Sequence, residues 1–166
     1  MRGCGETIDG TVRGPCRQPN SRDGFIQVEL SAEPVPYHII TTFGECPDEG
    51  ECHALALSSC RVACLSLDVV RGQIASSTLR KALTAPCLRR LETFSYLMRT
   101  RMERDEELRM MLKYLPSIPH SVTGMLVGPT TFEVAVHLTV GRTTFWTNLK
   151  LVYIGCRWMC SVADLG

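Results

Sequence analysis

The pattern of the last 46 residues constrains the fold more than any other part of the chain. Apolar and polar residues alternate through 131–140 and 143–154, and glycine-containing pairs beginning at Gly141 and Gly155 interrupt the alternation. A period of two is typical of a half-buried strand, and a two-residue turn with glycine is typical of a tight hairpin. The pattern therefore predicts an antiparallel β-meander, to which 121–127 adds a further strand.

The two turns also determine which residues face each other across the meander. A turn at Gly141 places Val134 opposite Leu149 on one face and Glu133 opposite Lys150 on the other, and a turn at Gly155 places Leu149 opposite Val162. A one-residue slip would turn every apolar side chain outward, so the register is strongly specified. We predict one buried face made of Phe132, Val134, Val136, Leu138, Phe145, Leu149, Leu151, Trp158 and Val162.

The rest of the chain predicts helices that cover this meander, preceded by two strands. Residues 1–23 contain four glycines and two prolines and predict a flexible arm. Residues 24–166 are expected to form a single α+β domain, a curved antiparallel meander packed on helices. Within it we expect strands and a loop in 24–50 (strands at 25–30 and 37–43), helices in 51–116 and the meander in 120–166.

Capping residues and prolines mark the expected helix ends. An apolar run predicts one helix over 52–70, and Ser76 or Ser77 is expected to cap another that starts near residue 78. Pro86 suits the first turn of a helix that runs from about residue 87. Asp105, followed by two glutamates, is typical of a helix N-terminus and predicts a second, short helix that Pro116 ends.

Length and charge exclude several classes of protein. At 166 residues, 45% of them hydrophobic, the chain fits one globular domain, and its net charge of +1 argues against a dominant nucleic-acid or membrane-binding field. All but three of its 18 basic residues are arginine, which suits contacts with partners. Six arginines crowd 89–109, but the interspersed glutamates favour a solvated helical face over a nucleic-acid footprint, which stays open as an alternative.

The nine cysteines indicate a reducing compartment. Their number is odd and no secretory signal precedes them, so we expect reduced thiols in an intracellular protein, with the cytoplasm favoured and mitochondria as the alternative. No run of 18 to 20 uncharged apolar residues predicts a membrane span. We expect no cofactor and no zinc, because the nearest metal-like set lacks a C-x-x-C knuckle: Cys46, Cys52, His53, Cys60 and Cys64.

A family resemblance follows from the meander. The chain begins this region with Val122-Thr123-Gly124 and closes it with Gly155-Cys156-Arg157-Trp158 and Val162-Ala163-Asp164-Leu165. This pattern resembles the C-terminal half of NTF2-like domains, which commonly finish on a strand reading roughly Gly-x-Arg-Trp-x-Val-x-Asp-Leu. The resemblance implies a cystatin-like cone formed by a curved sheet and helices. A helix followed by such a meander is also similar to the Coa1 and Tim21 mitochondrial assembly factors, the second choice.

The resemblance implies where a catalytic site would lie. NTF2-like enzymes place a few polar groups in an apolar cone, and the expected register puts Thr147 and Asp164 opposite each other on the inner face, with Tyr153 toward the far end. Asp164 is the candidate base. A single acid without a placed partner favours a structural role over catalysis.

The outer face of the meander favours association. Here the register gathers an apolar surface around a tryptophan: Trp146, His137, Ala135, Val152, Met159, Ala163 and Leu165. One function class is therefore a non-catalytic interaction or assembly subunit that uses this face in a larger complex or a dimer. The other is a small-molecule binder or enzyme with Asp164 as base. A cavity holding Thr147 and Asp164 would favour the second class, and a cone filled by Phe94, Met98 and Met102 the first.

Overall fold

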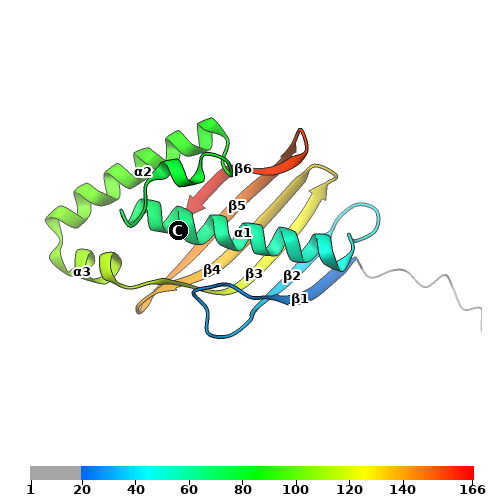
Figure 1. Cartoon of the computed structure of the whole chain (residues 1–166), viewed down its shortest axis with the longest axis horizontal. Helices are drawn as coiled ribbons and strands as arrows, with labels where there is room; N and C mark the ends of the chain where they lie inside the picture. The colour runs from blue at the N-terminus through cyan, green and yellow to red at the C-terminus, as the bar shows by residue number, and fades with distance from the viewer. Residues whose placement is uncertain (1–19) are drawn as a thin grey trace, which may run out of the picture.

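The computed structural model describes residues 20–166 and has an α+β fold, with one sheet and all of its helices on the same side of that sheet (Figure 1). Six strands form the sheet: β1 (Ser21–Ile26), β2 (Val35–Thr41), β3 (Ser117–Gly128), β4 (Thr131–Val140), β5 (Thr143–Ile154) and β6 (Arg157–Leu165). The helices are α1 (Glu49–Val70), the short 3-10 helix η1 (Ser76–Leu79), α2 (Ala85–Arg104) and α3 (Glu106–Tyr114).

The strands lie in the sheet in the order of the sequence, β1 to β6. Neighbouring strands pair antiparallel, except that β2 and β3 are parallel, with Tyr37 opposite Val122. The long connection between these two strands contains the helices, as a parallel crossover requires. The predicted four-stranded meander is confirmed as β3 to β6, and the N-terminal hairpin extends it on the β3 side.

The predicted register of β4 and β5 is confirmed. Val134 lies opposite Leu149, Phe132 opposite Leu151, and Glu133 opposite Lys150. Both predicted turn glycines, Gly141 and Gly155, have positive φ angles of 59° and 67°, which side chains with a Cβ rarely adopt. The turn chemistry and the apolar alternation therefore agree on one arrangement.

The predicted register of β5 and β6 is wrong beyond Cys160. Leu151 lies opposite Cys160 as expected, but Lys150 lies opposite Val162 and Leu149 opposite Ala163. Ser161 is the extra residue of this β-bulge, and its hydroxyl donates a hydrogen bond to the Lys150 carbonyl at 3.1 Å. The bulge reverses the faces of the residues that follow it. Val162 therefore leaves the predicted buried face.

Helix boundaries follow the predicted caps in two cases out of three. The Asp105 carboxylate accepts from the Leu108 amide at 3.0 Å and begins α3 as predicted, and Pro86 lies in the first turn of α2. The expected helix near residue 78 is instead the single 3-10 turn η1, and no side chain caps it. Both serines lie within the turn and Ala75 is its N-cap, so neither acts as the predicted cap; the Ser76 hydroxyl instead donates a hydrogen bond to the Glu92 carboxylate at 2.7 Å.

The N-terminal strands are shifted relative to their predicted bounds. The strand expected at 25–30 is β1, which starts at Ser21 and ends at Ile26, and the strand expected at 37–43 is β2. Residues 21–23 therefore belong to the sheet and not to the expected arm, because they pair with His38, Ile39 and Ile40 of β2. The remaining part of the expected arm, 1–19, lies outside the described residues.

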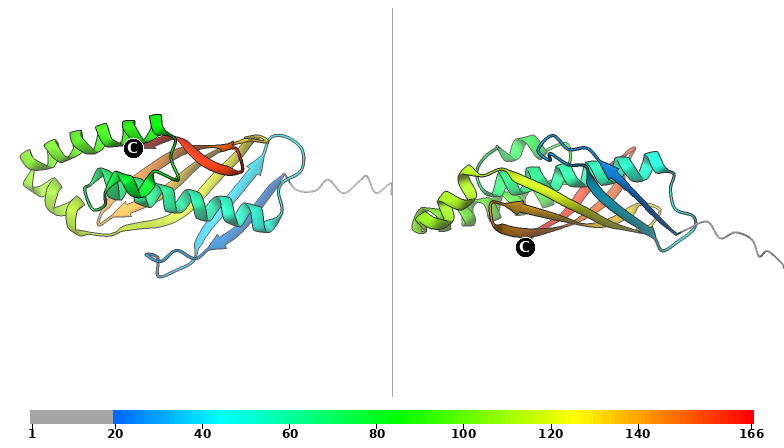
Figure 2. Two further views of the ribbon diagram at one scale, coloured as in Figure 1. Left: turned by 45° about the horizontal axis from the view of Figure 1, so that its top comes forward. Right: turned by 90° about the horizontal axis from the view of Figure 1, so that it is seen from below.

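The core lies between α1 and the sheet. Inward side chains of all central strands are buried, and Phe132 is one of the largest that are fully enclosed. Its ring packs where a side chain on Gly124 of β3 would stand, so a Cβ at this position would overlap the ring. Figure 2 shows α1 running along the sheet while α2 and α3 extend past one end of it.

One helix among residues 20–166, α1, is long and apolar enough to cross a membrane by length and composition. Of its most apolar stretch, 61% is buried within the fold. The core helix of a soluble protein passes the same test, so the finding is weak evidence about membranes.

Candidate functional site

The sheet face opposite the helices is uncovered in the part of the chain that the structure describes (Figures 1 and 2). We call this surface the open face. Strand alternation assigns to it the residues between the buried positions of each strand. Its central members are Ile40, Thr123, Met125, Glu133, Ala135, His137, Trp146, Asn148, Lys150, Val152, Met159, Val162 and Asp164.

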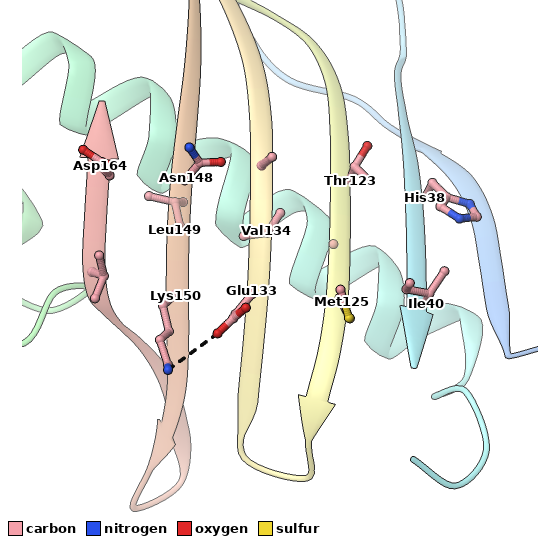
Figure 3. A pocket seen from close by; sticks show the side chains of 13 residues that line it. His38, Ile40, Thr123, Met125, Glu133, Val134, Asn148, Leu149, Lys150 and Asp164 are labelled. Carbon is pink, nitrogen blue, oxygen red and sulfur yellow. Dashed lines mark ion pairs between the residues drawn. The ribbon is translucent and has the colours of Figure 1, made fainter. Parts of the chain in front are cut away.

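A trough of about 490 Å³ crosses the middle of the open face (Figure 3). The strand registers explain it, because one cross-strand row carries mostly short side chains: His38, Thr123, Ala135, Asn148 and Asp164. The row on one side carries longer ones, among them Met125, Glu133 and Lys150. The trough is therefore a consequence of residue sizes in adjacent rows.

Two ion pairs lie at the trough. The Lys150 ammonium lies 3.6 Å from the Glu133 carboxylate, and both side chains are about half exposed (Figure 3). At the β2 end, His38 Nδ1 lies 2.7 Å from the Asp23 carboxylate. Exposed pairs of this kind contribute about 0 to 1 kcal/mol each, so they shape the surface more than they stabilise the fold.

An aromatic ridge lies beside the trough. The rings of His137 and Trp146 stack with centroids 4.7 Å apart, and the ring of His120 lies 5.1 Å from that of His137. Trp146 is 49% exposed even though it is stacked. Neighbouring residues on one face of a strand are about 7 Å apart, so the ridge and the trough are adjacent parallel rows. We use aromatic ridge for His120, His137 and Trp146.

Five of the six predicted interaction residues lie on the open face. They are Trp146, His137, Ala135, Val152 and Met159, which fall between buried positions of β4, β5 and β6. The prediction is wrong for Leu165 and its neighbour Ala163, because the bulge turns both toward the helices, where they pack against the core.

Sequence reasoning missed the contributions of β2 and β3 to the open face. Met125 could not be placed by extending the register through the turn after Gly128, because a bulge between Leu126 and Gly128 shifts the pairing by one residue. His120 could not, because a second bulge between Pro119 and Ser121 brings it beside His137. Ile40 could not either, since its place depends on the parallel pairing of β2 with β3, which no local turn signals.

The predicted catalytic arrangement is wrong in its geometry. Asp164 lies opposite Asn148 on the open face, whereas Thr147 lies opposite Leu165 and is fully buried on the helix side. The Thr147 hydroxyl finds no hydrogen-bond partner among residues 20–166. Tyr153 lies at the far end of β5 as expected, with its ring 5.4 Å from that of Trp158. These three side chains do not converge on one reacting atom.

The space that the resemblance assigns to a cone is filled on the α2 side. Met102 of α2 is buried, and Phe94 and Met98 pack against the same core. A separate groove of about 680 Å³ opens between the first half of α1 and the strand ends, where Leu55, Leu126 and Trp158 contribute to its lining. It contains neither Thr147 nor Asp164.

The structure does not bring the candidate metal ligands together. Among residues 20–166, no group of three or more His, Cys, Asp or Glu side chains is placed to hold a metal ion, including Cys46, His53 and Cys60. Burial raises the pKa of the Cys52 thiol to about 12, and a hydrogen bond with Cys60, together with burial, raises that of Cys64.

The prediction that this protein holds no structural zinc is tested by metal analysis of protein purified without chelator. We expect far less than one equivalent of zinc per chain.

No protein-family model, curated protein or solved structure matches this chain. A function for this chain is therefore inferred from the geometry of the open face.

Proposed function

We propose that this protein is a non-catalytic interaction subunit that associates through the open face of its sheet, within a dimer or a larger complex. The observation that carries the proposal is the asymmetry of the sheet. Side chains on the helix side of the central strands are almost completely buried, whereas Trp146 and several apolar side chains on the other side, among them Val152 and Met159, stay partly exposed.

The size and composition of the open face support association. Strands lie about 4.8 Å apart and neighbouring residues on one face about 7 Å apart, so five strands and four rows cover about 650 Å². Stable interfaces bury about 600 to 1,000 Å² per partner, so the open face is large enough to form one. Tryptophan, such as the exposed Trp146, is also one of the residues most enriched in binding hot spots.

The alternative, an enzyme or small-molecule binder of the NTF2-like kind, has less support. It needs an inner cavity with polar groups, and the inner position of Thr147 is closed by packed side chains. Asp164 faces a shallow trough that is open to solvent. General acid–base catalysis needs a second catalytic group placed beside such a carboxylate, and Thr147 and Tyr153 do not lie there.

The test is the substitution Trp146→Glu, compared with Leu97→Glu on α2. Both side chains are large, apolar and about half exposed, but Leu97 lies on a helix away from the open face. Each variant should stay folded by circular dichroism. We expect only Trp146→Glu to lose the complexes recovered by cross-linking in cells that express the chain. The proposal is wrong if this variant stays folded and keeps every partner and its oligomeric state.

A further inference from the structure

We infer that the partner of the open face is a second copy of this chain, and that the two copies pack the aromatic ridge of each into the trough of the other. This inference rests on the proposed function and adds the identity and the geometry of the partner. It follows from the fact that the ridge and the trough are adjacent, parallel and of complementary shape.

The rows of the open face set the geometry. Trp146 and His137 form one cross-strand row, and Asn148 and Ala135 form the next row on the same two strands. Consider a two-fold axis parallel to these rows and halfway between them. Rotation about it places the ridge of one copy over the trough of the other, and the reverse contact follows by symmetry.

Each ridge residue then meets a short residue of the second copy. Because the axis is parallel to the rows, a residue of β5 faces β5 and a residue of β4 faces β4. Trp146 therefore lies over Asn148 of the second copy, and His137 lies over Ala135. Asn148 and the neighbouring Asp164 offer oxygen acceptors for the indole N–H, a donor that is usually satisfied when it is buried.

The charge and the sheet geometry of the open face are compatible with contact between two copies of the chain. In the trough and its rim the Lys150 ammonium offsets the Glu133 carboxylate, which leaves one negative charge per copy at Asp164, and the whole chain carries a net charge of only +1. Two copies therefore do not repel each other strongly. The two faces would pack as aligned sheets about 10 Å apart, which is an ordinary sandwich arrangement.

The experiment uses two variants that damage opposite halves of the contact. Trp146→Glu removes the ridge and leaves the trough intact, whereas Ala135→Arg fills the trough and leaves Trp146 in place. Wild-type chain should sediment at twice the 18.5 kDa chain mass, and each variant alone should be monomeric. Leu97→Glu is the matched control and should remain a dimer.

Mixing the two variants is the decisive step. In the mixed dimer one ridge enters one intact trough, and the two introduced charges, which have opposite signs, lie on adjacent strands at the second contact. We therefore expect a heterodimer from two monomeric proteins, detected by sedimentation with one variant labelled. Circular dichroism must first show that both variants are folded.

Failure of this inference can be separated from failure of the proposed function. The second-copy inference is overturned if the wild-type chain is monomeric, if either folded variant stays dimeric, or if the mixture does not recombine. If the wild-type chain is monomeric but Trp146→Glu loses a protein cross-linked in cells, the open face binds a different partner and the proposed function stands. If that variant loses nothing, both fail.

Discussion

Replacing Leu149 and Val162 by alanine tests the bulged register of β5 and β6. The unbulged register places both side chains on the buried face. The structure places Leu149, 3% exposed, in the core opposite Val134, and it places Val162 on the open face opposite Lys150. The two substitutions should therefore differ greatly in their effect on the free energy of unfolding.

The magnitudes follow from burial. Leu149→Ala removes three buried carbons, a transfer loss of about 2.4 kcal/mol at about 0.8 kcal/mol each. The cavity left behind adds to this, so the total should be about 3 to 4 kcal/mol. Val162→Ala removes two partly exposed carbons and should cost about 1 kcal/mol or less. For a domain of this size, about 3 kcal/mol corresponds to a Tm lower by about 10 °C.

Urea denaturation followed by circular dichroism measures both values. The substitutions are made in the Trp146→Glu background, so that association through the open face does not add to the stability of either variant. Equal losses for the two alanine variants, or a larger loss for Val162→Ala, would refute the bulge and the outward placement of Asp164.

Three further predictions concern single contacts. Gly124→Ala should lower the free energy of unfolding by about 1 to 3 kcal/mol in urea titrations, because the new methyl group overlaps the Phe132 ring. An unchanged urea midpoint of unfolding would contradict this packing. Asp105→Ala should cost about 1 kcal/mol in the same assay through loss of the α3 cap, and Asp105→Asn should restore most of it. At pH 8 iodoacetamide should label the exposed Cys156 well before Cys52, because burial raises the pKa of the Cys52 thiol to about 12 and keeps it protonated. Equal labelling of the two cysteines, measured by peptide mass spectrometry, would count against the burial of Cys52.

Local signals predicted those parts of the fold that depend on neighbouring residues. The β4–β5 register follows from one glycine turn and alternating side chains, and both are local in sequence. The Asp105 cap likewise depends only on the three residues that follow it. Within such short distances few alternatives compete, so the physical argument from the sequence suffices.

The β-bulge shows where local reasoning fails. The extra residue Ser161 lies after the Gly155 turn and after the regular pairs up to Cys160. Neither the turn nor the alternation of the preceding residues therefore signals the bulge. One signal was available: the straight register buries the Asp164 carboxylate and exposes Leu165, whereas the bulged register does the reverse. An isolated buried carboxylate is costly, and that cost favours the bulge. The candidate site depended on this one residue, so its catalytic half was misplaced.

The trough depended on information that no single strand carries. Its short residues come from β2 through β6, and they form a row only after every strand register is known. Trp146 and His137 were predictable as an outward pair because one hairpin holds both. The row that adjoins them required the complete sheet.

The parallel pairing of β2 with β3 has a consequence for synthesis of the chain. Tyr37 pairs with Val122, about 85 residues later, so the first hairpin leaves the ribosome long before its neighbour strand exists. At about 5 to 20 residues per second this delay is roughly 4 to 17 s. During that time the edge of β2, which carries Tyr37, Ile39 and Ile40, has unpaired backbone groups and apolar side chains. We expect this segment to be the part of the nascent chain that most needs protection from incorrect pairing.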